Sequence, residues 1–520
     1  MTEQPLVTIL TLLVAVPLFG GFIILGIEEA RQALARKLAL VFTALAGFVA
    51  LAAWAAFNPA SGELQFVVKL PWIPALGVDY FVGLDGLGLA MVLLTALLVP
   101  MALLTAPRNA PPLQLALMLF LQAGLFGTFT ALNFFHWFLF WELSLIPAFF
   151  LIKLWGGPER GAAATQFFVY TMVGSVALLL SFLAIFLATG VLDFIKLADL
   201  AQKGELAADL AAKLGWPQLS AGTVSMIIFG GALLGFAVKV PLFPFHTWLP
   251  ATYAEAPTST TMLLTGAMSK MGVYGFLRIL APIFPEQMRQ AQTPLLWLAV
   301  GTIVLSAAAA FAQRDLKRIL AYSSINHLGY CLLGVFAAAG AGAGAVGVNN
   351  VERAAALSGV IVQMFNHGVT AAVLFCFVSF IENRADGLRG RDDFGGLRKV
   401  APVFCGLMGI ALFASIGLPG LSGFVGEFLI FKGAFSLAPW AAAGSTLGLL
   451  VTAVFLLTLM QRVFQGPLNP RWAGFADLTL RERLLVLPAI VLIFVLGIYP
   501  QALIGLTNAT VIRMAREFAL

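Results

Sequence analysis

The sequence predicts an all-α protein that crosses a membrane about fourteen times. Of its 520 residues, 61% are hydrophobic and only 10% are charged, and the mean hydropathy is +0.97. Soluble domains are far less apolar and carry about 25% charged residues. A helix needs roughly 20 apolar residues to cross a bilayer, and backbone groups in lipid must be satisfied internally, so the apolar runs are expected to be helices. The expected spans are residues 5–26, 38–57, 83–105, 112–132, 134–154, 164–189, 222–250, 257–281, 294–312, 318–340, 356–382, 402–433, 439–464 and 484–508.

The first apolar run and the cysteines argue against several other classes of protein. The run at residues 6–26 is longer than a signal-peptide core and has no basic region before it, so it is expected to be a retained span. Cys331, Cys376 and Cys405 are scattered in apolar runs, without the CxxC or CxxH spacing of metal ligands. Neither a disulfide framework nor a metal or iron–sulfur site is therefore expected in this chain.

Basic residues are distributed unequally between the two sides of the expected helices. If the N-terminus is external, the internal connectors hold eighteen Lys and Arg residues and the external connectors hold nine. Because basic residues favour the cytoplasmic side, both termini are expected in the periplasm of a bacterial inner membrane. The net charge of +6 is dispersed over many connectors, which argues against a nucleic-acid surface. The eighteen are Arg31, Arg36, Lys37, Arg108, Lys153, Arg160, Arg314, Lys317, Arg318, Arg384, Arg389, Arg391, Arg398, Lys399, Arg462, Arg471, Arg481 and Arg483.

Two of the expected spans are interrupted by residues that break helices. The seventh runs into residues 239–250, where Pro241 and Pro244 remove backbone donors and clash with the preceding turn. The twelfth contains residues 417–423 (GLPGLSG). Paired breaks in two halves are typical of inverted repeats that carry an ion site at each break. We therefore expect an N-terminal three-helix segment at 1–111, five-helix repeats at 112–281 and 294–464, and a C-terminal helix segment at 465–520.

Several ionisable side chains lie inside the apolar runs or at their breaks. An ionisable residue within a bilayer costs at least about 2 kcal/mol, so such residues usually mark an ion or proton pathway. The alternative for a lysine is to extend toward the interface, and a histidine can simply hydrogen-bond within the bundle. Asp85, at the start of the third span, has the position of a helix cap. The candidates are Glu142, Lys239, Lys270, His327, His367 and Glu427, with His246, Lys432 and Asp85 as accessory positions.

Segments along nearly the whole chain closely resemble, in order, the antiporter-like subunits of respiratory complex I. Within that family the chain is most similar to the M type, the chain-4 type of NADH–quinone oxidoreductase. Glu427 stands where the L and N types carry lysine, and the chain ends soon after the last expected span, without the long lateral helix of the L type. One departure is residues 251–253 (ATY), where the M type usually has Asp-Ala-His. The matching segments are 83–88 (GLDGLG), 140–147 (FWELSLIP), 239–250 (KVPLFPFHTWLP), 255–258 (EAPT), 270–275 (KMGVYG), 315–329 (DLKRILAYSSINHLG) and 418–428 (LPGLSGFVGEF).

The resemblance implies a proton relay through the middle of the membrane. It assigns Glu142 and Lys239 as a charge pair, Lys270 as the central relay, His327 and His367 as bridging groups, and Glu427 as the terminal proton carrier. Burial favours a neutral lysine and a neighbouring carboxylate favours a charged one, so a change in the separation of such a pair would load or discharge the lysine. Histidine titrates near neutral pH and can pass a proton between the two kinds of group.

The resemblance also implies that the chain works as one subunit of a larger enzyme. No cofactor or metal is expected in this chain, and NADH, FMN, iron–sulfur clusters and quinone are expected in partner subunits. The expected partners are L- and N-type antiporter-like subunits, small membrane subunits and membrane lipid. The same scaffold serves multisubunit Na⁺/H⁺ antiporters and membrane-bound hydrogenases, so these are alternatives, as is an inert structural subunit.

Overall fold

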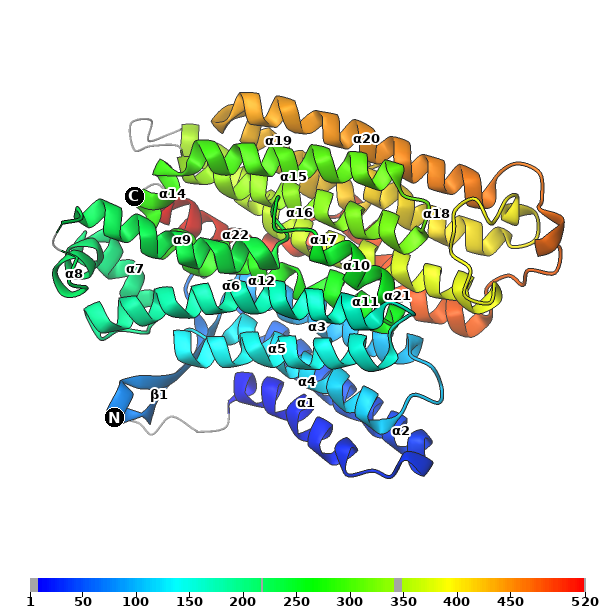
Figure 1. Ribbon diagram of the computed structural model, residues 1–520, viewed down its shortest axis with the longest axis horizontal. Helices are drawn as coiled ribbons and strands as arrows, with labels where there is room; N and C mark the ends of the chain where they lie inside the picture. Colours follow the sequence, from blue (N-terminus) through cyan, green and yellow to red (C-terminus); the bar gives the residue numbers. More distant parts are fainter. Residues whose placement is uncertain (1–7, 217, 341–347, 519–520) are drawn as a thin grey trace.

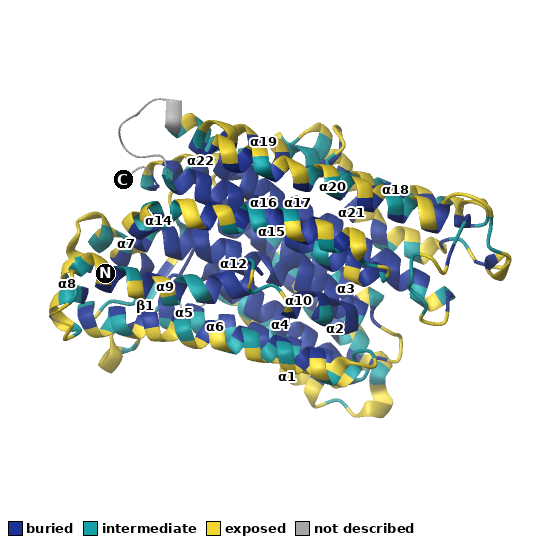
Figure 2. Ribbon diagram, turned by 45° about the horizontal axis from the view of Figure 1, so that its top comes forward, coloured by how far each residue is buried: buried dark blue, intermediate teal, exposed yellow. Residues whose placement is uncertain are grey.

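The computed structural model describes residues 8–216, 218–340 and 348–518. Its helices run side by side along the long axis of the molecule and pack around a shared interior (Figure 1). Figure 2 shows buried residues through the middle of the bundle and exposed residues along its outer helices and end loops. The fold is mostly helical, as the hydropathy of the sequence predicts.

Up to the first break, the chain forms long helices, a β-hairpin and two short helices. Side-chain oxygens of Thr8, Asp85, Asn133 and Ser220 accept backbone N–H groups at helix N-termini, which stabilises the first turns of α1, α3, α5 and α9. The helix bounds are α1 (Ile9–Leu25), α2 (Gln32–Ala56), α3 (Gly86–Thr105), α4 (Pro112–Thr130), α5 (Phe134–Trp155), α6 (Arg160–Thr189), α7 (Phe194–Gln202), α8 (Glu205–Lys213) and α9 (Ala221–Lys239).

A β-hairpin separates α2 from α3. Its strands β1 (Gln65–Ile73) and β2 (Val78–Leu84) pair antiparallel, and Gly77 at the turn has a φ of 61°, which glycine adopts without strain. The hairpin is not apparent from the spans, because its alternating pattern is short and is interrupted by Pro71. Lys69 Nζ lies 2.5 Å from Asp193 Oδ2, and this ion pair joins the hairpin to the N-terminus of α7.

After the first break, the helix that carries Lys270 is irregular. Lys270 begins the short α12 (Lys270–Gly275), which lies between two π-helical segments, η3 (Leu264–Met268) and η4 (Phe276–Leu280). Such π-turns are rare and occur frequently at functional sites. The remaining bounds are α10 (Trp248–Glu255), α11 (Thr258–Leu263), α13 (Ala281–Ile283), α14 (Pro285–Gln290), α15 (Gln292–Ala312), α16 (Leu316–Gly340), α17 (Val348–Arg384), α18 (Pro402–Ile416), α19 (Ser422–Leu437), α20 (Pro439–Phe464), α21 (Leu480–Ile498) and α22 (Gln501–Glu517).

Within the described residues, ten helices are long and apolar enough to cross a membrane, or up to 11 if one bent pair is a single span. By length and composition, the structure therefore has fewer spans than the fourteen or so expected. Part of the reason is that several expected spans are divided into shorter helices. The expected span 222–250 ends as a helix at Lys239, and 402–433 consists of α18 and α19, separated by residues that include Gly417 and Gly420 at φ values of 81° and 91°. The expected span 484–508 consists of α21 and α22, which meet at an angle of 67°.

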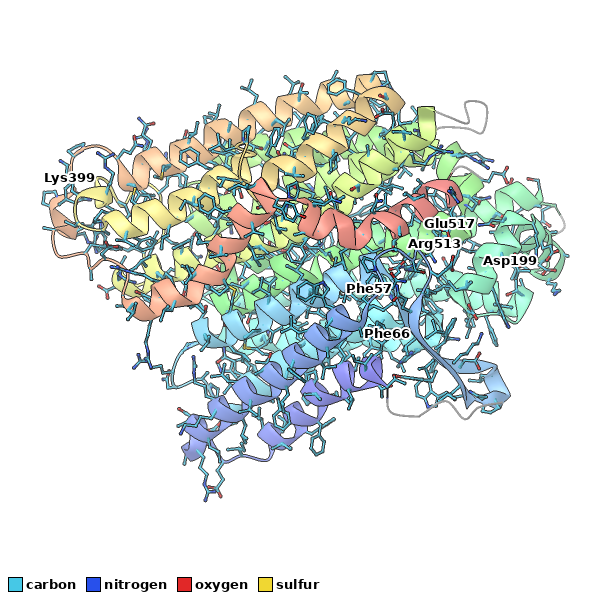
Figure 3. All side chains as sticks on the ribbon, turned by 180° about the vertical axis from the view of Figure 1, so that it is seen from behind. Phe57, Phe66, Asp199, Lys399, Arg513 and Glu517 are labelled. Atoms are coloured by element: carbon cyan, nitrogen blue, oxygen red, sulfur yellow. The ribbon has the colours of Figure 1, made fainter. Side chains whose placement is uncertain are left out.

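The two ends of the bundle carry different structures. We call the end with β1, β2, α7 and α8 the hairpin end, and the end with the connectors 385–401 and 465–479 the connector end. Figure 3 shows Asp199 and Glu517 toward the hairpin end and Lys399 at the connector end. The start of α1 also lies at the hairpin end, because Thr11 Oγ1 is 2.7 Å from the Tyr80 hydroxyl. The first and last described residues therefore lie at the same end of the bundle. Residues 1–7 and 519–520 lie outside the described residues.

Candidate functional site

Lys270 lies at the centre of the bundle and is fully buried. In the π-turn before it, the Ser269 backbone N–H bonds to Leu264 O, five residues back instead of four. The Lys270 ammonium donates to Thr265 O at 2.5 Å and lies 2.8 Å from His367 Nδ1. Lys270 is therefore held between the backbone of its own irregular helix and a side chain of α17.

A line of polar contacts continues from His367 to Glu427. The rings of His367 and His327 have centroids 5.1 Å apart. His327 Nδ1 is 3.1 Å from Glu427 Oε1. All of these side chains are almost completely buried, on α17, α16 and α19. The structure thus brings four of the six predicted site residues, Lys270, His367, His327 and Glu427, into one chain of neighbours.

Several polar residues that belong to this line of contacts were not predicted from the sequence. Gln363 Nε2 lies 3.3 Å from both Glu427 Oε1 and His327 Nδ1, so it spans the last contact. Asn366 Nδ2 donates to Ser422 O at 2.5 Å, at the start of α19. A usable signal was present, because Gln363, Asn366, His367 and Thr370 recur at helical spacing in an apolar span and so form one polar stripe.

Glu142 and Lys239, which were predicted to form a charge pair, do not form an ion pair in this structure. Lys239 ends α9 and is buried, with Nζ 4.8 Å from the centroid of the Trp141 ring. Glu142 follows Trp141 on α5, and its Oε1 is buried without a hydrogen-bond partner in the described chain. Among the described residues, no ion pair within 4.0 Å joins the two side chains. The structure therefore places the two residues in one neighbourhood, separated by more than ion-pair distance.

A small cavity lies between Lys239 and the helix that carries Lys270. The volume that the centre of a water molecule can reach there is about 10 Å³, which is roughly the space for one water molecule. Tyr253 and Ser269 both line this cavity. The Ser269 hydroxyl is in turn 3.4 Å from Lys270 Nζ. The cavity is lined by Lys239, Trp248, Tyr253, Leu264, Met268 and Ser269.

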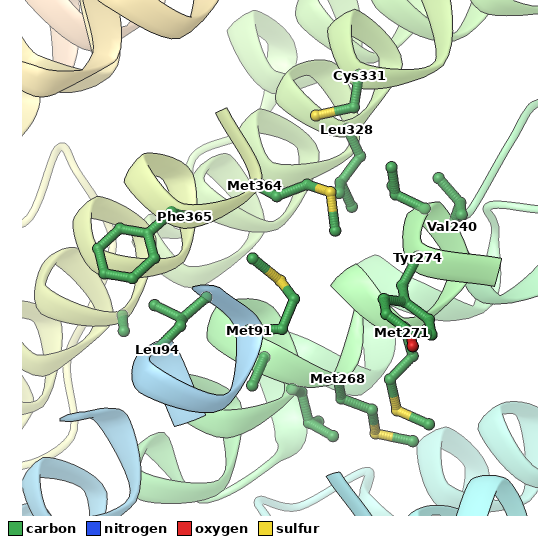
Figure 4. Close-up of a cluster of buried hydrophobic side chains, with 14 of the residues drawn as sticks. Met91, Leu94, Val240, Met268, Met271, Tyr274, Leu328, Cys331, Met364 and Phe365 are labelled. Carbon is green, nitrogen blue, oxygen red and sulfur yellow. The ribbon is translucent and has the colours of Figure 1, made fainter. Parts of the chain in front are cut away.

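Buried apolar side chains lie on or next to the helices that carry this line of polar contacts. Figure 4 shows Met91, Met268, Met271 and Met364, from four different segments, gathered with Leu328 in the interior. All of them are buried. Apolar packing of this kind keeps bulk water out of the interior and strengthens electrostatic interactions among the charged groups buried there.

The three accessory candidates lie outside this chain of contacts. His246 lies within the first break and its ring stacks on Phe243, at 5.4 Å between centroids. Lys432 pairs with Glu352 of α17 at 2.8 Å, and its side chain is 42% exposed, so it does not pair with Glu427. Asp85 caps α3 through Gly88 N at 3.1 Å and also pairs with Arg278 at 2.5 Å and Arg513 at 3.0 Å, at the hairpin end.

A second charged cluster lies at the connector end, around Arg389. Its guanidinium is 2.5 Å from Asp315 Oδ2, 3.3 Å from Glu382 Oε1 and 3.7 Å from Glu255 Oε1. Burial tends to lower the pKa of Arg389, but the two carboxylates of Asp315 and Glu382 outweigh that effect and raise it. Arg389 therefore stays charged and ties the end of α10 to α16 and α17.

The similarity to known proteins includes the segments that carry the candidate site. The family described as NADH:quinone oxidoreductase/Mrp antiporter, TM matches residues 131–455, which include Glu142, Lys239, Lys270 and Glu427. NADH-quinone oxidoreductase subunit M of Rhodobacter capsulatus is 35% identical over 496 residues, with 95% of this chain and 93% of the relative covered. This chain belongs to that family. The subunit M of Mycobacterium tuberculosis is 32% identical over 540 residues, with 96% and 93% covered.

Solved structures share the fold over nearly the whole chain. A chain of respiratory complex I from Thermus thermophilus superposes with a TM-score of 0.83 at 29% identity, covering 99% of this chain and 100% of that chain. A chain of the Mrp complex from Dietzia gives a TM-score of 0.82 at 21% identity, covering 97% of both chains. The Mrp similarity is evidence for the fold alone, whereas the complex I similarity extends the relationship already seen in sequence.

Proposed function

We propose that this chain is the proton-translocating, antiporter-like membrane subunit of an NADH–quinone oxidoreductase of the complex I type. Electron transfer from NADH to quinone takes place in partner subunits, which hold the cofactors, and this chain couples that reaction to proton movement. The observation that carries the proposal is the buried line of contacts from Lys270 through His367 and His327 to Glu427. The parent complex is supported by the relatives, which are named as subunit M of that enzyme.

The contacts support a relay of single proton transfers. The Lys270 ammonium gives a proton to His367 Nδ1 and becomes a neutral amine. His367 then releases the proton of Nε2 toward His327, whose Nε2 has no partner in the described chain. The 5.1 Å between ring centroids is short enough for a ring rotation or one bridging water. His327 finally passes its Nδ1 proton to Glu427 Oε1, so each histidine is neutral before and after the transfer.

Glu142 and Lys239 supply protons to this relay. A carboxylate close to a lysine stabilises the ammonium form, and a distant one does not. In the open arrangement seen here Lys239 is free to lose its proton toward Lys270, and in a closed arrangement it would be reloaded. Movement between the two arrangements is what the partner subunits would drive.

We propose that the chain crosses the membrane about fourteen times, with inverted five-helix repeats at 112–281 and 294–464. The two breaks, α9 to α10 and α18 to α19, are its support, since each adjoins a buried ionisable side chain. The hairpin end faces the periplasm and the connector end faces the cytoplasm, because basic residues at 384–399 and 465–483 lie in and beside the two connectors of the connector end. L- and N-type antiporter-like subunits, small membrane subunits and lipid surround the bundle.

Reporters fused to the chain test this orientation. A reporter inserted at Arg391 is expected to face the cytoplasm, and one fused after Leu520 is expected to face the periplasm, because an odd number of crossings separates them. An alkaline phosphatase and a fluorescent protein reporter at each position give opposite signals. Two reporters on one side of the membrane would contradict the proposed topology.

A multisubunit Na⁺/H⁺ antiporter or a membrane-bound hydrogenase is the second candidate parent complex. The fold of the Mrp chain favours it, but at 21% identity this likeness is one of fold. The two candidates differ in their soluble subunits. Purification of the complex through this chain is expected to recover NADH-oxidising, iron–sulfur subunits, and vesicles containing it are expected to take up protons when NADH and quinone are added. Recovery of membrane subunits alone, with Na⁺-driven proton movement, would replace the first proposal by the second.

A further inference from the structure

Lys239 and Lys270 are both buried and do not contact each other. Lys239 borders the small cavity from α9, and Lys270 approaches it from the other side through the Ser269 hydroxyl, at 3.4 Å. Among the described residues, Lys239 makes neither an ion pair within 4.0 Å nor a side-chain hydrogen bond. A proton that moves from one lysine to the other must therefore cross the cavity.

Tyr253 is the side chain that reaches across this gap. It comes from α10, beyond the first break, and is one of the largest fully buried side chains, at 1% exposure. Its side chain lines the cavity together with Lys239 and Ser269. The remaining lining side chains, from Trp248, Leu264 and Met268, offer one indole N–H and apolar surface, and the Trp248 N–H is already bound to Val238 O at 3.1 Å.

The chemistry of a phenol suits such a gap. Its oxygen can accept one hydrogen bond while its proton is donated to another group, so it can exchange protons without carrying a charge for long. The cavity has roughly the space for one water molecule, which is enough to link the Lys239 amine to the phenol. Ser269 then links the phenol to Lys270, since its hydroxyl both donates to Thr265 O at 2.9 Å and lies near Lys270 Nζ.

We propose that Tyr253 is the proton bridge between Lys239 and Lys270 in this chain. The inference rests on the proposed function and names the step by which the two halves of the relay communicate. The Lys239 ammonium gives a proton to the cavity water, the water gives a proton to the Tyr253 oxygen, and the original phenol proton passes through Ser269 to the neutral Lys270 amine. One proton enters and one leaves at each group, and rotation of the phenol and serine O–H bonds resets the bridge.

Tyr253→Phe is the direct test, because it removes the hydroxyl and keeps the ring that packs in the core. In the intact complex reconstituted in vesicles, this variant is expected to lower the number of protons moved per NADH oxidised by at least about fivefold, since a positioned proton-transfer group contributes about 100-fold or more. Tyr253→His supplies another proton-exchanging side chain and is expected to restore most of the loss. Ser269→Ala is expected to give a similar loss, and it serves as the second variant if Tyr253→Phe prevents assembly.

Tyr274→Phe is the matched control. Tyr274 is also fully buried, but its hydroxyl donates to Phe129 O at 3.3 Å and does not line the cavity. Parent-like proton movement in Tyr253→Phe, an equal loss in Tyr274→Phe, or a failure of Tyr253→His to rescue would each overturn the proposed bridge. Lys270→Ala distinguishes a failure of the relay from a failure of the bridge. If Lys270→Ala leaves proton movement intact, the proposed relay is wrong. If Lys270→Ala loses proton movement and Tyr253→Phe does not, the relay stands and only the proposed role of Tyr253 is wrong.

Discussion

The two helix breaks hold their ionisable side chains in different ways. At the break between α18 and α19, Glu427 contacts His327 at 3.1 Å and Gln363 at 3.3 Å, and the line continues from His327 through His367 to Lys270. At the break between α9 and α10, Lys239 has an aromatic ring at 4.8 Å and a small cavity beside it. Glu142, its expected partner, lies beyond ion-pair distance. One half of the site is therefore connected to the central lysine, and the other half is interrupted.

This difference indicates where the relay is controlled. The line from Lys270 to Glu427 needs only a ring rotation or one bridging water between its two histidines, while the Lys239 half also needs Glu142 and Lys239 to approach each other. Electrostatic energy between unit charges falls inversely with distance and rises as the surroundings become apolar, so a small movement of Glu142 relative to Lys239 has a large effect in this interior. We therefore expect changes at the Glu427 half to block transfer and changes at the Lys239 half to alter its control.

The largest effect is expected for Glu427→Gln. The amide keeps the shape of the side chain and nearly all of its packing but cannot exchange a proton, so proton translocation is expected to fall at least about tenfold. Glu427→Lys is expected to be less damaging, because lysine still cycles, with a pH optimum shifted upward by its higher intrinsic pKa. Proton uptake per NADH oxidised is measured in reconstituted vesicles, with assembly checked by native gels. Parent-like proton movement in both variants would make Glu427 a structural residue.

A smaller effect is expected for Glu142→Ala, at the interrupted half. The contacts from Lys270 to Glu427 do not involve this residue, so the exit half stays intact while reloading of Lys239 slows. We expect coupled turnover to fall about fivefold, on the order of the 1 kcal/mol that a charge at moderate distance contributes. Lys239→Ala removes the other member of the pair and is expected to be at least as severe. If a well-assembled Glu142→Ala complex pumps as well as the parent, the pair has no loading role.

Much of the fold and part of the site follow from the sequence for identifiable reasons. Apolar runs must be helical in lipid, so the helical fold was predictable. The π-turns on either side of Lys270 were not, because they depend on packing against neighbouring helices and leave no mark in hydropathy. The hairpin was missed because Pro71 interrupts a short alternation, and the bend between α21 and α22 was missed although Pro500 signals a break. The polar contacts of Gln363 and Asn366 depend on which face of α17 meets α16 and α19, and only the folded chain supplies that.

The smallest effect is expected for Lys432→Gln, which tests whether a lysine in an apolar run must belong to the relay. Lys432 lies on α19 only five residues after Glu427, but its ammonium contacts Glu352 at 2.8 and 3.0 Å and its side chain is partly exposed. A pair this open contributes about 0–1 kcal/mol, and its loss leaves Glu427, Gln363 and His327 in place. We expect proton uptake per NADH to change less than about twofold, with assembly unaffected. Glu352→Gln is the matched variant, since it opens the same pair from α17. A loss as deep as that of Glu427→Gln in either variant would extend the relay to the outer face of α19 and erase the contrast between buried, connected carriers and peripheral ones.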